Sequence, residues 1–142
     1  MRDLPAALGE HGWRATVLTP SYGHFHTLPG ATFLGSVSIE FRLGRESVAV
    51  YNVPGSVDGV TNIVFDHKGF ESHGANIIYS EDGPTRPFAT DANKFALFGA
   101  AAAAWSNAWP TASTIWRIVM PIGTSIRPPR RTLPARAKTL VP

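Results

Sequence analysis

Residues 66–105 place a charged strand end, a glycine-containing loop with Tyr79, an acidic turn and a long helix in direct succession. Thr90 is predicted to cap this helix, because its hydroxyl can accept a hydrogen bond from a free amide of the first turn, and Asp91 suits the positive helix end. The helix is expected to run to about Trp105. Its predicted core-facing stripe consists of Phe95, Phe98, Ala102 and Trp105. Loops between such elements are where a fold exposes chemistry, which draws attention to Tyr79.

The start of the chain also combines a helix signal with a strand signal. Residues 2–12 suit a short helix with a glycine just past its end. Residues 14–20 follow as a strand rich in β-branched residues. Helix followed by strand is half of a βαβ unit, so the first strand is expected to precede this sequence and to be missing from it. Residues 1–105 are therefore predicted to be α/β in class.

A β-hairpin is expected in the middle of the sequence. Apolar and polar residues alternate over residues 32–53, which indicates two half-buried strands, with a turn expected at Gly44-Arg45. Residues 60–66 form a further predicted strand that ends in charge. The expected sheet is thus built from a hairpin and at least two more strands.

Composition limits the possible chemistry. Cysteine is absent, which excludes disulfides, thiolate metal sites and a cysteine nucleophile, and the cytoplasm is the expected location. No run of roughly 18 apolar residues indicates a membrane span. The net charge of +3 is unevenly distributed, because six of the 13 basic residues follow Trp105 and no acidic residue does. Residues 1–105 keep 7 basic and 10 acidic residues, a net charge of −3.

Residues 106–142 differ in character from the rest. They contain several prolines and no acids, and they sustain neither strand nor helix periodicity, so we expect a basic Pro/Arg-rich tail. Two explanations remain open, a disordered extension and translation in a shifted reading frame. The arginines of residues 127–138 suit non-specific contact with nucleic-acid phosphates, but no aromatic residues lie among them for base stacking.

Two pairs of side chains are further candidates for chemistry. Asp66 and His67 end a predicted strand, but adjacent strand residues point to opposite faces, so a solvated strand end is the favoured interpretation. His24 and His26 share a face if the chain is extended, yet no cysteine or carboxylate cluster completes a metal shell, and structural roles are expected. Phosphate-binding glycine loops and the GxSxG elbow are absent from the sequence.

The order of these segments resembles the N-terminal domain of bacterial glycogen synthases and plant starch synthases. The resemblance covers residues 1 to about 105 and predicts a partial catalytic domain there, ahead of the tail. The sequence is similar to the family at the first helix and strand, at the strand and loop ending in Tyr79, and at the helix that begins with an aspartate. The matching residues are Pro20, Tyr22, Gly23, residues 65–70, Gly74, Tyr79, Pro87, Phe88, Asp91 and residues 94–98.

The resemblance implies a Rossmann-like domain of a glycosyltransferase B-type enzyme. Such enzymes transfer glucose from ADP-glucose to the non-reducing end of an α-1,4-glucan, and no metal or other cofactor is expected. The family's Lys-x-Gly-Gly loop, Trp-His region and nucleotide-sugar domain are all absent here, so the isolated chain is predicted to be inactive. Tyr79 alone matches a position where the family places an aromatic residue that lines the active cleft, and it is the expected substrate contact.

Two alternatives of other classes remain. In the first alternative, the chain is a non-catalytic glucan- or partner-binding module with Tyr79, Trp13 and Phe70 as contacts. In the second it associates with nucleic acid through its basic tail, which the absence of interleaved aromatics makes the weaker hypothesis.

Overall fold

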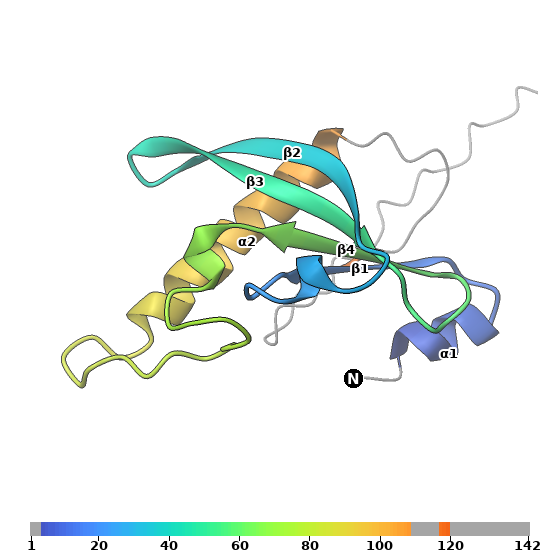
Figure 1. The fold of residues 1–142 in the computed structure, drawn as a ribbon, viewed down its shortest axis with the longest axis horizontal. Coiled ribbons are helices and arrows are strands. Elements are labelled where there is room, and N and C mark those ends of the chain that lie inside the picture. Colours follow the sequence, from blue (N-terminus) through green and yellow to red (C-terminus); the bar gives the residue numbers. More distant parts are fainter. Residues whose placement is uncertain (1–3, 109–116, 120–142) are drawn as a thin grey trace, which may run out of the picture.

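The computed structural model describes residues 4–108 and the backbone of residues 117–119 (Figure 1). Within these residues, two α-helices and two 3₁₀ turns accompany a single sheet. In chain order the elements are α1 (Leu4–Glu10), β1 (Ala15–Pro20), η1 (Phe25–Thr27), β2 (Thr32–Phe41), β3 (Gly44–Val53), β4 (Val60–Asp66), η2 (Lys68–Phe70), α2 (Ala89–Ala108) and β5 (Arg117–Val119). This mixture confirms the predicted α/β class.

The sheet has five strands in the order β2-β3-β4-β1-β5. The β2, β3 and β4 strands pair antiparallel, whereas β1 lies parallel to both β4 and β5. Because β1 and β4 run in the same direction, Pro20 pairs with Phe65 and the two carboxyl ends meet at one edge. The predicted hairpin and the strand at residues 60–66 are confirmed.

The hairpin turns two residues earlier than predicted. Phe41 pairs with Gly44, so the turn consists of Arg42 and Leu43, and Gly44-Arg45 already belongs to β3. Arg42 carries the positive φ of 55° that a tight hairpin turn requires at its first central residue. The Arg45 guanidinium then reaches Glu40 on the opposite strand, with Nε 3.0 Å from Oε1. Gly35, with φ 135°, occupies a register shift in β2, where glycine adopts the backbone at low cost.

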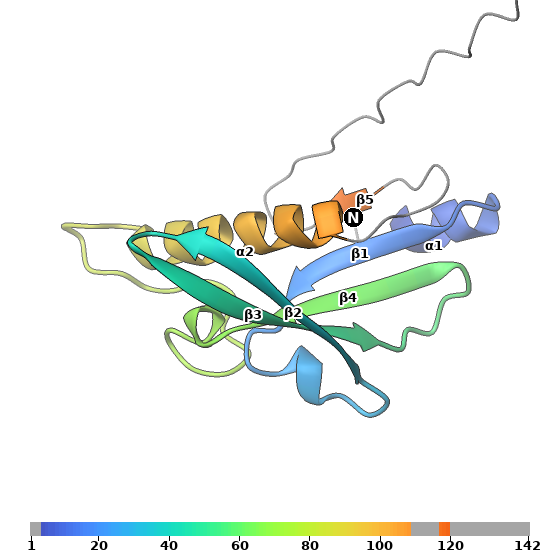
Figure 2. The same ribbon diagram turned by 90° about the horizontal axis from the view of Figure 1, so that it is seen from above.

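The α2 helix lies along one face of the sheet and closes the core (Figure 2). Phe98 packs edge-on against Phe65 of β4, with ring centroids 5.7 Å apart, and Trp105 meets the same ring at 6.4 Å. The predicted stripe was wrong at Phe95, which is only half-buried. Leu97 and Ala101 are buried instead, because they lie at i−1 and i+3 relative to Phe98 on the side that faces the sheet. The helix also continues to Ala108, beyond the expected end at Trp105.

Part of the expected tail belongs to the sheet. The backbone of Arg117–Val119 forms β5 and pairs with β1 from Thr16 to Leu18, so these three residues were wrongly assigned to an unstructured extension. A three-residue strand is too short to show the alternation that identifies strands in a sequence. Residues 109–116 and 120–142 lie outside the described residues, and the assignment of a basic tail there stays a prediction.

Candidate functional site

The carboxyl edge of β1 and β4 brings three polar side chains together. The Ser21 hydroxyl donates to Asp66 Oδ1 at 2.5 Å, and His26 Nδ1 lies 3.1 Å from the same oxygen and 3.2 Å from Ser21 Oγ. Serine, histidine and aspartate are the residues of a hydrolase triad, but here the serine contacts the aspartate directly. Ser21 is fully buried, and its Oγ also accepts from the Gly23 amide. We conclude that this group closes the turn after β1 onto β4 and holds no free nucleophile.

Asp66 and His67 diverge, as their adjacent positions predicted. His67 Nε2 lies 3.3 Å from Glu46 Oε2 on β3, while its Nδ1 accepts from the Gly69 amide at the start of η2. The expectation of a solvated strand end was wrong, because the His67 side chain is only 11% exposed and both residues have protein partners. The turn after β4 folds back over the strand end and covers the imidazole.

The two histidines after β1 do not share the extended geometry considered for a metal pair. His24 precedes and His26 belongs to the η1 turn, and the His24 ring packs on Phe25 with centroids 5.7 Å apart. Within residues 4–108, no group of three or more His, Asp or Glu side chains is positioned to hold a metal ion. Both side chains therefore have structural contacts that explain their presence.

The loop that carries Tyr79 is anchored to α2 by a buried charge pair. Lys94 is 1% exposed, and its ammonium approaches the carbonyl oxygens of Ile77 at 3.4 Å and Ile78 at 3.2 Å. Asp91 accepts from the Ser80 amide with both carboxylate oxygens, at 3.0 and 3.2 Å. Because these bonds flank Tyr79 on both sides, they fix the backbone from which its ring projects.

Tyr79 itself is 54% exposed, while Tyr22 is buried nearby. The Tyr22 carbonyl accepts from the Asn76 amide at 2.6 Å, which ties the turn after β1 to the same loop. Burial raises the pKa of Tyr22 to about 12, with smaller contributions from Tyr79 and Asp91. At the carboxyl edge of β1 and β4, the exposed ring of Tyr79 therefore projects from an anchored loop, and the buried Tyr22 beneath it stays neutral.

The start of α2 is capped differently from the prediction. Thr90 lies inside the helix, and its amide and hydroxyl both donate to Asp82, at 2.7 and 2.6 Å. Thr90 is thus a donor and not the accepting cap, and Asp82 supplies the accepting carboxylate from eight residues earlier. The hydrogen bonds from Thr90 lower the pKa of Asp82.

Two other residues were predicted as contacts of a binding module. Phe70 is fully buried in the core between η2 and α2, so that part of the prediction was wrong. Trp13 is 45% exposed but follows α1 at the opposite end of the sheet from η2 (Figure 1). Of the three predicted contacts, only Tyr79 combines exposure with a place at the carboxyl edge.

Comparison with known sequences decides the family. A sequence model described as the starch synthase catalytic domain matches residues 1–117. The chain belongs to this family. No curated protein matches it. The match continues to the first residue of β5, beyond the resemblance that ended near Trp105.

Family membership makes this chain part of a glycosyltransferase domain, and several of the matching residues have structural roles here. Asp91 and Lys94 anchor the loop of Tyr79, and Tyr22 lies beneath it. The sequence pattern alone assigned these residues no contact with the loop. The spacing of an acid and a base at i and i+3 is the signal that could have indicated the pair. In the portion of the chain that the structure describes, none of the helices has the length and apolar character needed to cross a bilayer.

Proposed function

We propose that this chain supplies part of the sugar-nucleotide cleft of a glycogen or starch synthase. The reaction of the complete enzyme is transfer of glucose from ADP-glucose to the non-reducing end of an α-1,4-glucan. The family match over residues 1–117 is the observation that carries this proposal. The position of Tyr79 at the carboxyl edge of parallel strands supports it, because open α/β sheets bind ligands at that edge.

Tyr79 is the residue we propose to contact substrate. An exposed phenol ring offers an apolar face for the C–H groups of a sugar ring and a hydroxyl for one hydrogen bond. The bonds from Lys94 and Asp91 to the flanking backbone pre-position that ring, which reduces the entropy lost on binding. No metal or cofactor is part of the proposal.

The isolated chain is proposed not to catalyse the transfer. The leaving diphosphate gains negative charge in the transition state and needs cations or amide donors directed at it. The cation packed beneath the loop of Tyr79 is Lys94 of α2, and its ammonium is directed at two backbone carbonyls and Asp91. The Lys94 ammonium is therefore not available to the substrate. Arg86, at the far end of the same loop, lines a hollow that Tyr79 does not line.

An assay with labelled ADP-glucose and glycogen tests this proposal. The purified chain should incorporate no label above a control without protein. Turnover above that control, lost when Tyr79 is changed to alanine, would show that the chain alone holds a complete active site. The exposed Phe33, whose ring meets Tyr51 edge-on in the hairpin, provides a matched control variant, Phe33→Ala.

A glucan-binding module without catalysis is the second candidate, favoured by the exposure of Tyr79 on an anchored loop. Retention of the chain on glycogen, weakened by Tyr79→Ala and unchanged by Phe33→Ala, is the expected result if this function exists. Equal retention of both variants would remove Tyr79 from the contact. The nucleic-acid alternative depends mainly on residues outside those that the structure describes and stays a prediction.

A further inference from the structure

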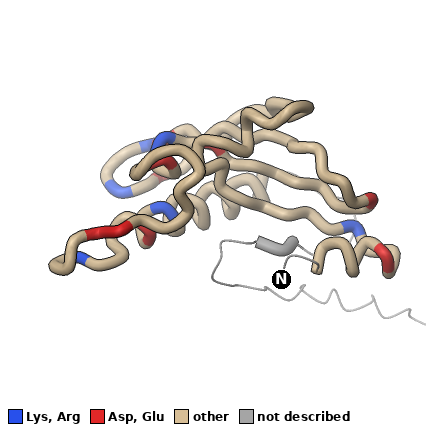
Figure 3. The backbone as a smooth tube through the Cα atoms, turned by 60° about the horizontal axis from the view of Figure 1, so that its bottom comes forward, with Lys and Arg blue, Asp and Glu red and all other residues tan. Residues whose placement is uncertain are grey.

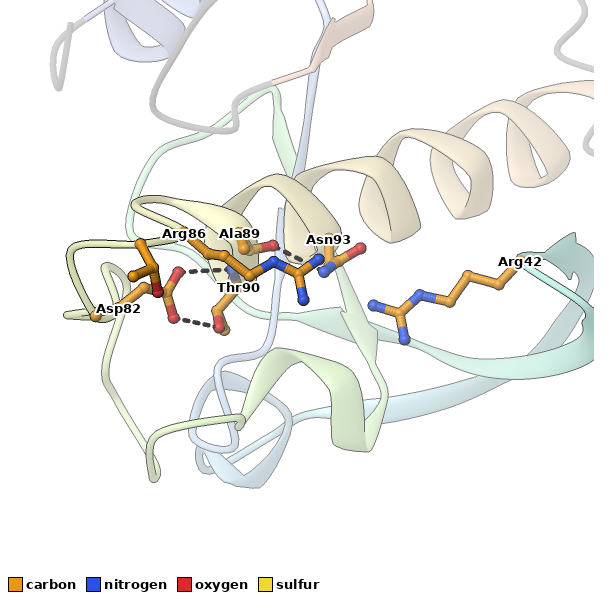
Figure 4. A pocket seen from close by; sticks show the side chains of 8 residues that line it. Arg42, Asp82, Arg86, Ala89, Thr90 and Asn93 are labelled. Carbon is orange, nitrogen blue, oxygen red and sulfur yellow. Dashed lines mark hydrogen bonds between the residues drawn. The ribbon is translucent and has the colours of Figure 1, made fainter.

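A hollow that Tyr79 does not line lies between the hairpin tip and the start of α2 (Figure 4). Its volume is about 730 Å³. Arg42 enters it from the β2–β3 turn and Arg86 from the turn before α2, and the two guanidinium groups extend toward one another across it (Figure 4). The other lining residues are Asp82, Gly83, Thr85, Ala89, Thr90 and Asn93.

A smaller hollow of about 330 Å³ adjoins the first and shares Arg42, Thr90 and Asn93 with it. It adds Lys68 from η2 to the lining. We call the two hollows together the basic groove, defined by Arg42, Lys68 and Arg86. Tyr79 lines neither hollow. Figure 3 shows charged residues concentrated at the ends of the molecule, one of which carries the hairpin tip and the turn before α2.

The acidic residues of the basic groove already have partners. Asp82 accepts two hydrogen bonds from Thr90, and Glu46 lies 3.3 Å from His67 Nε2. The three cations differ in this respect: among residues 4–108 none of them lies within 4.0 Å of a carboxylate oxygen. Arg45, also on the hairpin, is paired with Glu40. The side chains that line the two hollows include three cations (Arg42, Lys68, Arg86) and two carboxylates (Glu46, Asp82), so the basic groove has an excess of one positive charge and its cations have no direct carboxylate contact within the described residues.

Guanidinium groups are suited to phosphate, because their planar N–H pairs match two of its oxygens. The Arg42 guanidinium lies 5.6 Å from the centre of the Phe41 ring, a stacking contact that restricts its orientation. The amide of Thr90 at the start of α2 is occupied by Asp82, so recognition would depend on side chains. We propose that the basic groove binds the phosphate group of a small phosphate monoester at a site separate from Tyr79.

The size of the groove indicates a phosphate with a carrier. Pockets for small molecules commonly measure about 300–1,000 Å³, and the larger hollow falls within that range. The lining offers Thr85 and the Asn93 amide, which suit the hydroxyl groups of a polar carrier such as a sugar. Free phosphate shares the same chemistry and would fill only part of the space.

Isothermal titration of the full chain at low salt with inorganic phosphate and with a sugar monophosphate tests the proposal. We expect Arg42→Gln and Arg86→Gln each to weaken binding by about tenfold or more, because each removes a charge-assisted hydrogen bond. Arg45→Gln is the matched control on the hairpin and should change affinity by less than about twofold. Lys68→Gln is the fourth variant. Circular dichroism of the four variants and of wild type verifies that these substitutions leave the fold intact.

Stronger binding of the sugar monophosphate identifies a carrier-bound phosphate, and equal binding identifies free phosphate; both support the site. Absence of binding to wild type, or equal weakening by Arg45→Gln, overturns it. If ADP-glucose displaced the bound phosphate compound from wild type and did not bind to Arg86→Gln, the groove would belong to the nucleotide sugar. That result would contradict a separate site. Because glucosyl transfer is assayed independently, failure here leaves the proposed function untouched.

Discussion

Lys94 and Asp91 lie three residues apart on α2, with Lys94 Nζ 3.5 Å from Asp91 Oδ1, and both bind the backbone of the loop that carries Tyr79. Neither charge is left without partners, since the ammonium meets two carbonyl oxygens and the carboxylate meets the Ser80 amide. The pair therefore connects helix, loop and the exposed ring in one buried network.

Replacing Lys94 with methionine should lower the free energy of unfolding by about 3 kcal/mol, because it leaves the buried Asp91 carboxylate without its counter-charge. Urea denaturation followed by circular dichroism measures the change. Lys68→Met is the control, since Lys68 is exposed and belongs to η2. If Lys94→Met and Lys68→Met unfold at the same urea concentration as wild type, the pair does not hold the loop.

Acid should loosen the start of α2 through Asp82. The hydrogen bonds from Thr90 place the folded pKa of Asp82 below its ordinary value, so the unfolded chain binds more protons and stability rises with pH. The contribution is present above about pH 4 and is lost as the pH falls through the lower folded pKa. Helicity measured against pH should therefore fall below about pH 4 in wild type and change less in Asp82→Asn.

The neighbouring exposed carboxylate supplies the control for that measurement. Glu81→Gln should keep the wild-type acid profile, whereas Asp82→Asn should already have weaker helix capping at neutral pH. Identical acid profiles for wild type and Asp82→Asn would contradict the capping role.

The strands were the most predictable part of the fold. Residues 32–53 and 60–66 alternate or run apolar because β3 and β4 lie within the sheet and their side chains face opposite sides. The position of the turn was less predictable, since Gly44-Arg45 suits a turn locally while Arg42 takes the strained backbone in the structure. Burial of Ile39, Val48 and Val50 on the core side of the hairpin specifies the register, and burial against the rest of the fold is not a local property.

Contacts between distant segments could not be predicted. Asp82 caps α2 only because the loop before it folds back, and a sequence pattern fixes no such path. Ser21 meets Asp66 across 45 positions, and the basic groove gathers residues 42, 68 and 86 from three elements. The sequence shows no cluster of these three cations, because positions 42, 68 and 86 lie far apart along the chain. The predicted stripe was wrong at Phe95 for a related reason. The helix α2 has apolar residues on all its sides, and its packing on the sheet decides which of them are buried.

Alkaline conditions should destabilise the fold through Tyr22. Its pKa rises from 10.0 in the unfolded chain to about 12 in the folded state, mainly through burial. Between these values the unfolded chain loses a proton that the folded chain keeps, so stability is complete below pH 10 and falls as the pH rises toward 12. The loss amounts to about 2 kcal/mol. Tyr22→Phe should remove most of this slope in urea denaturation at increasing pH, whereas Tyr51→Phe should retain it; equal slopes in all three proteins would contradict the assignment.

Truncation of Phe98 in α2 and of Phe88 just before it should have very different effects on stability. Phe98 is fully buried and packs on Phe65, so Phe98→Ala should cost about 3–5 kcal/mol through lost burial and a cavity between α2 and the sheet. Phe88, directly before the helix, is 73% exposed, and Phe88→Ala should change stability by less than about 0.5 kcal/mol. Urea denaturation of both variants beside wild type measures the difference. Equal losses would mean that α2 does not pack on the sheet through Phe98, and the loop anchored by Lys94 would then lack a fixed support.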